Sequence, residues 1–527
     1  MISKKFFLLP IALLLAATAE AIAVEAVAPT TKELARRLLA HDSFDIYLVP
    51  KEHNIIADDD KMFTGWKSHF TKDGAVVELS HAGTDHNTIH EYDTHVPLIF
   101  WGPAHCQAGR SRQRVALAQV APTLGKLLGV GMEPMAYAPP LEACTKSTAQ
   151  QPQAVLLLVI DQGGWFTLQQ NAGQWPNIAK MMAEGFSFES AYTDYGGSGT
   201  SASHASLGTG TFPRDNGIFN NDPYYPGLDK VAEVYTGPVG VEPSQLLRAT
   251  LMDRFLATYK DHAVTLSYSA ASRAAIGMAG HGATYRGGGK SQVFWFDNKK
   301  KEFTSDEALF RQPEASKGVP FGQEAFQQRR QGIWAQQDCH GRDGKVFAKC
   351  MLGSPAFAQV EGNVLDKALL EQKARFEQEG TKGLVMLSLK GVDYCGHYLG
   401  QESLECRATL SETDRQIGRL VATMREMTHG NMVAVVTADH GVAPLTLFSH
   451  GSMVLDSGLT ATLNGRFSGA KKQYAPIKQV SNNAVKLDQS ELKAAGYEVK
   501  DVVKFLKDFR ADDRLFFREV LSLEDLR

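Results

Sequence analysis

Long apolar runs, rather than alternating ones, give the clearest structural signal along this chain. Residues 154–160 are seven consecutive apolar residues, and the runs 383–389 and 432–437 are similar. Runs of this length predict strands that are covered on both faces, as in a parallel sheet. Between the second and third runs, a helix that ends near Gly430 is predicted by apolar residues at helical spacing, namely Ile417, Leu420, Val421 and Met424. This alternation predicts the α/β class: a doubly wound, mainly parallel sheet with helices on both faces.

Further elements are predicted by shorter patterns. The strands are expected at 45–50, 74–80, 96–101, 262–269 and 292–297, and the helices at 31–39, 122–128, 176–186 and 502–509. Gly129 follows the second of these helices directly and is the expected stop signal.

Each of the three long apolar runs leads into an acidic residue. Asp161 follows the first run, the second closes at Asp393 with His397 four residues later, and Asp439 and His440 follow the third. Ligands of open α/β sheets bind outside the carboxyl ends of the strands, so these side chains should face a site. Three carboxylates and two imidazoles suit two divalent metal ions, with zinc favoured by the imidazoles.

A histidine-rich segment precedes these motifs. Residues 81–103 contain His81, His86, His90 and His95. A single histidine is more often structural than a ligand, and four of them cannot all bind metal. The turn-like Gly83-Thr84-Asp85 before His86 makes that residue the best ligand candidate.

Composition shifts divide the chain into parts. Residues 1–23 combine two lysines, an apolar run and small residues, which is typical of a cleaved secretory signal. Residues 24–131 hold strand patterns, and 132–153 are rich in Pro, Ala, Ser, Thr and Gln, as in a surface linker. Residues 154–527 hold the three strand motifs, with an expected insertion or cap near 280–360. The protein is therefore expected in the periplasm or outside the cell.

Composition and charge narrow the possible partners. The 43% apolar share and 21% charged share are those of a globular protein, and the net charge of -3 gives no reason to expect a nucleic-acid polymer. The apolar run in 1–23 is too short for a comfortable membrane span, although an uncleaved anchor is the alternative to a cleaved signal, and no later stretch is long enough to span. Oligomeric state is not indicated.

Six cysteines in an exported chain permit three disulfides. Local pairing would join Cys339 to Cys350 and Cys395 to Cys406, which leaves Cys106 with Cys144. Six cysteines allow fifteen pairings, however, and the sequence does not choose among them. No C-x-x-C motif is present, which disfavours a zinc ribbon.

Residues 193–222 form a glycine- and hydroxyl-rich stretch that enters a predicted helix. Small residues and backbone amides at a helix start suit an anion, although a flexible surface loop would have a similar composition.

Together these motifs resemble the alkaline phosphatase superfamily, and within it the two-zinc enzymes with a threonine nucleophile. The resemblance covers most of the chain after residue 23. It rests on Asp161, Thr200-Ser201-Ala202-Ser203-His204 with Thr209-Gly210, Asp393-x-x-x-His397, Thr437-Ala438-Asp439-His440-Gly441, and Gly83-Thr84-Asp85-His86 leading into His95-Val96-Pro97.

The resemblance implies the following roles. One zinc ion would be bound by Asp393, His397 and His86. A second would be bound by Asp161, Asp439 and His440. Thr200, the nucleophile, would bind this second metal as well. Asn221 and Arg273 would bind phosphoryl oxygens of the substrate. We expect Asp93 and His95 to have structural roles.

Two features depart from the family pattern. The histidine ligand and the His-Val-Pro strand usually follow the Asp-His-Gly motif, whereas here they come first, so the chain resembles a circular permutant joined through 132–153. Ala271 stands where the monoesterase branch has a lysine, two residues before the arginine. This loss predicts monoesterase activity with appreciable diesterase activity alongside.

The expected function is hydrolysis of small phosphate monoesters through a phosphothreonine intermediate at a two-zinc site. A phosphodiesterase or nucleotide pyrophosphatase using the same residues is the alternative. A catalytically silent zinc-binding protein is a third hypothesis. Thr200 argues against it, because a metal-storage site does not require a hydroxyl group facing the metal ions.

Overall fold

The structure of the protein is a computed structural model that describes residues 28–40, 43–58, 67–79, 83–132, 139–144, 151–237, 240–286, 289–320, 333–334, 351–481 and 483–527. The expected signal segment, His81, and the pair Cys339 and Cys350 lie outside these residues. None of the helices in the described ranges is long and apolar enough to cross a bilayer.

A nine-stranded sheet forms the centre of the molecule. Its order is β15 (Glu302–Thr304), β14 (Gln292–Asp297), β13 (Ala263–Ser269), β16 (Lys382–Leu389), β7 (Ala154–Ile160), β17 (Met432–Thr437), β5 (His95–Trp101), β8 (Phe186–Tyr192) and β6 (Gly109–Ala116). The five strands from β14 to β17 are parallel, and β5 and β15 run antiparallel to their neighbours. The predicted fold class is confirmed.

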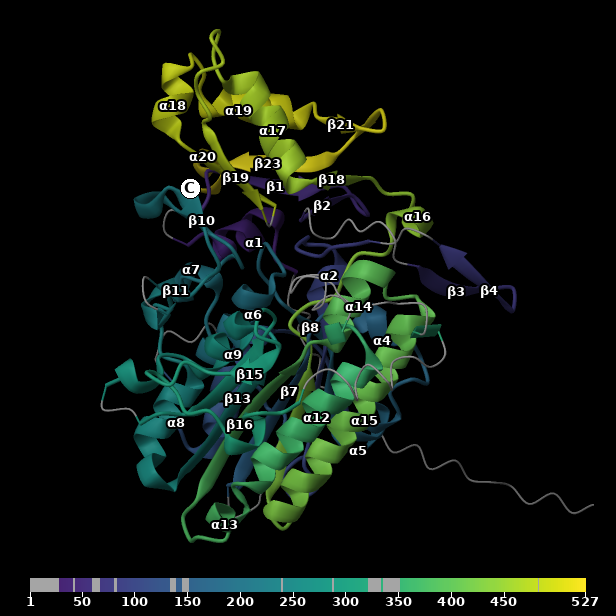
Figure 1. Cartoon of the computed structure of the whole chain (residues 1–527), viewed down its shortest axis with the longest axis vertical. Helices are drawn as coiled ribbons and strands as arrows, with labels where there is room; N and C mark the ends of the chain where they lie inside the picture. The colour runs from purple at the N-terminus through teal and green to yellow at the C-terminus, as the bar shows by residue number, and fades with distance from the viewer. Residues whose placement is uncertain are drawn as a thin grey trace, which may run out of the picture.

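Helices cover both faces of this sheet. One face packs against α4 (Trp165–Gln170), α5 (Pro176–Glu184), α12 (Pro355–Leu370), α14 (Gly391–Leu399) and α15 (Leu404–Met427). The other packs against α3 (Val120–Leu128), α6 (Thr200–Thr209), α8 (Leu251–Tyr259) and α9 (Ser272–Ala279). Figure 1 shows α12 and α15 side by side, with α8 and α9 at the other side of the molecule.

Strand β7 explains why the sequence pattern is continuous rather than alternating. Leu156, Leu158 and Ile160 point into the core under α5 and α15, whereas Val155 and Leu157 point into the core under α3 and α6. All seven residues are buried. Because both faces are covered, every position is apolar.

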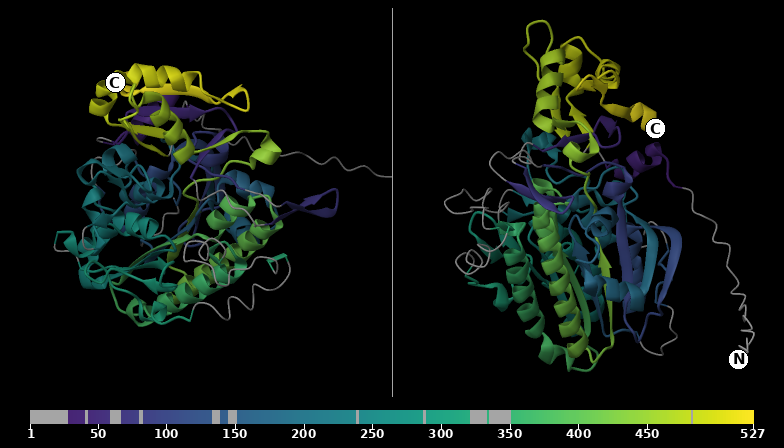
Figure 2. Two further views of the ribbon diagram at one scale, coloured as in Figure 1. Left: turned by 45° about the horizontal axis from the view of Figure 1, so that its top comes forward. Right: turned by 90° about the vertical axis from the view of Figure 1, so that its right-hand side faces the viewer.

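A smaller antiparallel sheet lies at one end, in the order β19 (Ile477–Ser481), β20 (Ala484–Leu487), β1 (Ile46–Pro50) and β23 (Phe517–Ser522). It packs against α17 (Asp456–Phe467) and α19 (Val499–Lys507) around its own apolar core. Figures 1 and 2 show β1, from the start of the chain, among strands from its end. The helix expected at 502–509 corresponds to α19.

Most of the shorter predicted elements are present. The helix expected at 31–39 is α1 (Thr31–Leu38), and α3 ends at Gly129, which has the left-handed φ of 70°. The strand expected at 74–80 is β4 (Ala75–Leu79), which pairs with β3 (Ser68–Lys72) in a projecting hairpin. Strands β14 and β15 lie within the region expected as an insertion, but they extend the main sheet.

One boundary was wrong in a way that affects the site. The second apolar run was expected to continue as a strand to Asp393, but β16 ends at Leu389 and Asp393 lies in the first turn of α14. Gly391 begins this helix close to Thr409 of α15, where a Cβ would lie 3.1 Å from the Thr409 Cγ2 atom. The helix places His397 one turn after Asp393, on the same face.

Candidate metal centre and nucleophile

Helix α6 positions the candidate nucleophile. Most of its residues are small and all ten are buried, so this part of the glycine- and hydroxyl-rich stretch is a packed helix rather than a flexible loop. The helix approaches α9 so closely that a Cβ at Gly208 would lie 2.3 Å from the Gly277 carbonyl oxygen. Thr200 is the first helical residue, and its Oγ1 lies 3.4 Å from His440 Nε2. It therefore lies at the positive end of the helix.

Asp161, Asp439 and His440 converge beside Thr200. Their candidate ligand atoms lie within 4.8 Å of one another, and all three residues are buried. His440 Nε2 is 3.1 Å from Asp439 Oδ2 and 3.7 Å from Asp161 Oδ1. Its Nδ1 donates to the carbonyl oxygen of Gly441 at 2.9 Å, which leaves Nε2 for a metal ion. These are the three residues that the family resemblance assigns to the second zinc ion.

The other expected ligands lie next to this group. His86, Asp393 and His440 offer atoms within 4.8 Å, and so do Asp85, His86 and His397. His397 Nε2 is 3.1 Å from Asp393 Oδ1, and the His86 ring stacks on His440 with centroids 3.7 Å apart. The six expected ligands thus form one cluster, to which Asp85 adds a carboxylate that the sequence analysis missed.

Two observations test whether this cluster fits divalent cations. Asp161 Oδ1 and Asp439 Oδ2 are buried and accept no hydrogen bond among the described residues. Burial and the neighbouring Asp439 raise the pKa of Asp161 well above its ordinary range. Burial alone would lower the pKa of His440, but Asp439 and Asp161 raise it to about 9. Crowded buried carboxylates of this kind require compensating positive charge, so the residues fit a metal site.

Neighbouring side chains orient the cluster. Gln162 donates its backbone N–H to Asp439 Oδ1 at 3.0 Å and its side-chain amide to Asp393 Oδ1 at 3.2 Å. His397 Nδ1 donates to the Thr84 carbonyl oxygen at 3.0 Å, which leaves its Nε2 facing Asp393. A Cβ at Gly396 would lie 1.8 Å from Gln162 Oε1, so a larger residue there would displace the Gln162 amide from Asp393.

His204 lies beside the first residue of α6, Thr200, which is the candidate nucleophile. Its Nδ1 lies 2.8 Å from the Thr200 carbonyl oxygen, and its Nε2 lies 2.8 Å from the hydroxyl of Ser388 on β16. Complete burial lowers the pKa of His204 to about 4, so the ring is neutral. It therefore connects the start of α6 to the sheet.

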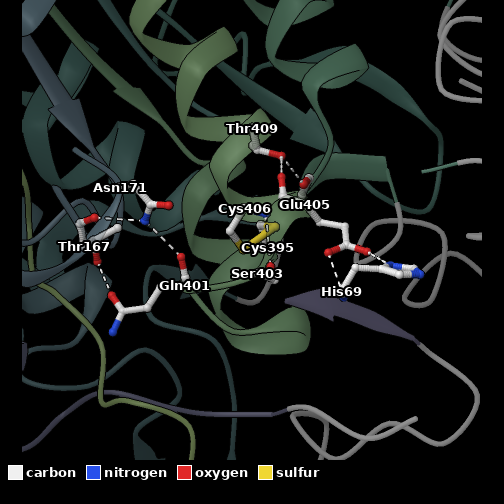
Figure 3. The surroundings of a disulfide bond; sticks show 10 residues. His69, Thr167, Asn171, Cys395, Gln401, Ser403, Glu405, Cys406 and Thr409 are labelled. Carbon is white, nitrogen blue, oxygen red and sulfur yellow. Dashed lines mark hydrogen bonds and ion pairs between the residues drawn. A yellow bond between two sulfur atoms is a disulfide. The ribbon is translucent and has the colours of Figure 1, made fainter. Parts of the chain in front are cut away.

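A disulfide fixes the helix that carries Asp393 and His397. Cys395 on α14 is bonded to Cys406 on α15 (Figure 3). Nearby, Glu405 accepts a hydrogen bond from the His69 backbone and lies 2.6 Å from the His69 ring. Cys106 is bonded to Cys144. Both the local pair Cys395–Cys406 and the remaining pair Cys106–Cys144 are thus formed as expected, and the pair Cys339–Cys350 lies outside the described residues.

The two expected substrate-binding residues lie on separate elements. Asn221 Oδ1 accepts a hydrogen bond from the Ser201 N–H at 2.9 Å, so its amide is anchored to the start of α6. Arg273 lies in the first turn of α9, with Nη1 3.5 Å from Glu233 Oε1. Burial opposes its charge, but Glu233, Asp222 and Asp161 raise the pKa of Arg273 above its already high value.

The expected structural histidine, His95, does lie apart from the cluster. Its Nε2 is 2.8 Å from the Glu189 carbonyl oxygen, and its ring stacks on Tyr192. Asp93 accepts hydrogen bonds from the Thr88 backbone and hydroxyl.

Sequence reasoning missed Lys390. This side chain is 1% exposed, and its Nζ lies 2.7 Å from Asp161 Oδ2 and 2.7 Å from Asp393 Oδ2. The signal was present, because Lys390 is a charged residue directly after an apolar run. It was overlooked because the strand was expected to continue through it.

A sequence model of the type I phosphodiesterase / nucleotide pyrophosphatase family matches residues 155–518. Similar curated proteins include a calcium-transporting ATPase of Myroides odoratus, 24% identical over 406 residues that cover 68% of this chain and 69% of that protein. Two alkaline phosphatases are also 24% identical: PhoV of Synechococcus elongatus over 354 residues and PafA of Elizabethkingia meningoseptica over 347. Each of these two matches covers 58% of this chain and 62% of the phosphatase, which is less than two thirds of its length.

The crystal structure of wild-type alkaline phosphatase PafA is a similar solved structure. It matches with a TM-score of 0.54 at 20% identity, over 68% of this chain and 76% of that one. The likeness shows a shared fold.

Proposed function

The chain belongs to the type I phosphodiesterase / nucleotide pyrophosphatase family, within the alkaline phosphatase superfamily, and from this we propose that it hydrolyses phosphate monoesters through a phosphothreonine at a two-zinc site. Membership makes it a phosphoric ester hydrolase. The observation that supports the finer proposal is the position of Thr200, a buried hydroxyl at a helix start, 3.4 Å from His440 in a cluster of carboxylates and imidazoles.

In this proposal two zinc ions, when bound, lower the pKa of the attacking hydroxyl and stabilise the charge on the entering and leaving oxygens. Asp161, Asp439 and His440 would hold one ion, and Asp393, His397 and His86 the other, with Asp85 close by. Calcium is a poorer fit because it prefers shells made only of oxygen ligands.

The chain's own groups carry out the transfer. Thr200 Oγ1 forms a bond to phosphorus while the bond to the ester oxygen breaks, and the alcohol leaves with a proton. Water then cleaves the phosphothreonine, which releases phosphate and restores the hydroxyl. His204 holds the Thr200 backbone, and the Asn221 amide and Arg273 guanidinium bind oxygens of the phosphoryl group.

A phosphodiesterase is the second candidate, favoured by the family model that matches and by Ala271, which supplies no cation. Both reactions would use the same nucleophile and ligands, so they differ only in how many anionic oxygens the site neutralises. The substrates are expected to be small phosphate esters, processed after export to the periplasm or the cell exterior.

We also propose that the chain is a circular permutant of the family fold. Two observations support this: the family match begins at residue 155, and the preceding segment still supplies β5 to the main sheet and His86 to the cluster. Residues 132–153 would then join the family's original ends.

The test compares Thr200→Ala with Thr209→Ala, a buried threonine about 13 Å away at the other end of α6. The purified protein would be given matched monoester and diester substrates, and the phosphoenzyme would be trapped with acid and measured by mass spectrometry. Thr200→Ala should keep its zinc and lose the phosphoenzyme and almost all turnover, whereas Thr209→Ala should keep both. Retention of most of the wild-type kcat by Thr200→Ala would reject the nucleophile. If the wild-type protein binds two zinc ions but hydrolyses neither substrate, the hypothesis of a catalytically silent zinc-binding protein is favoured.

A further inference from the structure

Lys390 bridges the two proposed ligand sets. Its Nζ lies 2.7 Å from a carboxylate oxygen of Asp161 and 2.7 Å from one of Asp393. In the proposed function these carboxylates serve different metal ions. The ammonium group is therefore located where the two sets meet.

Burying an ammonium group is costly unless it is paired. Lys390 meets this condition with two carboxylates, which together occupy two of its three N–H donors. Its stem leaves the end of β16 and reaches across to the residue that follows β7. A charge held in this way is preorganised, because it has little freedom to move away.

Besides Lys390, one further cationic side chain is proposed for the site, whereas the lysine expected at position 271 is absent. In the proposed function the second cation is Arg273, which lies in the first turn of α9 with its Nη1 3.5 Å from Glu233 Oε1. Position 271, two residues before the arginine, carries only a buried methyl group. A monoester dianion has one more anionic oxygen than a diester, and Arg273 alone leaves that charge uncompensated.

We propose that Lys390 is a specificity-determining residue that donates to a non-bridging oxygen of a phosphate monoester, in place of the lysine absent at position 271. The inference rests on the proposed function and deepens it. The positive charge comes from the end of a central strand instead of the start of α9. It also revises the expectation drawn from Ala271, because the site has the two cations that a monoester requires.

The rival role is purely structural, in which Lys390 only balances the charge of Asp161 and Asp393. The two roles predict different activities toward monoesters and diesters. A structural cation affects metal binding, and hence all substrates equally. A substrate-binding cation discriminates between monoesters and diesters while the metal content stays the same.

The test combines Lys390→Met with Ala271→Lys, singly and together. Lys382→Met is the matched control, because Lys382 begins the same strand and its Nζ donates to the Pro152 carbonyl oxygen at 2.8 Å, at the opposite end of the strand from Lys390. For each protein, zinc content is measured by elemental analysis, inorganic phosphate binding by calorimetry, and kcat/KM with one monoester and one diester.

We expect Lys390→Met to keep two zinc ions, to bind inorganic phosphate more weakly, and to lose about 10²- to 10³-fold in monoester kcat/KM, the usual effect of removing one preorganised donor. The diester value should fall by much less. Ala271→Lys should restore the monoester preference in the Lys390→Met protein and leave the wild-type preference almost unchanged. Lys382→Met should resemble the wild type.

Equal losses for both substrates, or loss of zinc from Lys390→Met, would overturn the inference. If Lys390→Met does not fold, Ala271→Lys in the wild-type chain still decides, since a large gain in monoester preference there would show that the charge was missing. Failure of the proposed function is a separate outcome, seen as a wild-type protein that hydrolyses neither ester.

Discussion

Gly441→Ala should damage the metal cluster through a steric clash of known size. Gly441 follows His440, and an added Cβ would lie 2.0 Å from the Tyr92 carbonyl oxygen, whereas real Cβ contacts are essentially never under 3.0 Å. The backbone must therefore move by about 1 Å. The Gly441 N–H donates to the Asp93 carbonyl oxygen at 2.7 Å, and its own carbonyl oxygen accepts from His440 Nδ1 at 2.9 Å. The displacement consequently reaches the ring that faces Asp161 and Asp439.

Overpacking of this kind typically lowers the free energy of unfolding by about 1–3 kcal/mol. A shift of about 1 Å in a catalytic group can reduce the rate by about 10²-fold. We therefore expect Gly441→Ala to fold, to bind zinc more weakly in competition with a chelator, and to lose about two orders of magnitude in kcat/KM.

The matched control is Gly465→Ala. Gly465 lies inside α17, where an added Cβ would meet nothing within 4 Å. This change should leave zinc affinity and kcat/KM intact and stabilise the protein by up to about 1 kcal/mol, because alanine is the better helix former. If Gly441→Ala instead retains wild-type zinc affinity and kcat/KM, the proposed link between this turn and the metal ligands is wrong.

Three further predictions concern metals, pH and connectivity. Chelation should abolish activity and zinc should restore it, with elemental analysis giving two zinc ions per chain; active protein with one ion or none would contradict the two-metal site. Burial opposes protonation of His281, but its hydrogen bond to Asp253 at 2.8 Å raises the pKa of His281 above 6.5 in the folded protein. The His281–Asp253 pair therefore stabilises the folded state fully below about pH 6.5, and this contribution is lost as the pH rises through the folded-state pKa. The melting-temperature gap between wild type and His281→Gln should therefore narrow from pH 5.5 to pH 9, and a constant gap would exclude this linkage. If the chain is permuted, cleavage between residues 145 and 150 should preserve activity better than cleavage at the 428–431 turn between α15 and β17, as activity assays of the nicked proteins would show.

The fold class and most of the proposed ligands could be predicted from sequence patterns and motifs alone. A strand buried on both faces must be apolar at every position, so the runs that became β7, β16 and β17 could be recognised without any knowledge of their neighbours. Because parallel strands end at the same edge of a sheet, Asp161, Asp439 and His440 could be expected to meet.

Which other groups join them depends on how distant segments of the chain pack together. Strand β16 ends at Leu389, and Gly391 then packs closely against Thr409 of α15, a contact between distant segments that local sequence does not encode. Without that boundary, Lys390 could not be placed between Asp161 and Asp393. Asp85 likewise gains its position from hydrogen bonds that bring residues 84–86 to α14, more than 300 residues later. Periodicity reports burial along a single element, whereas contacts between distant segments depend on how those elements pack.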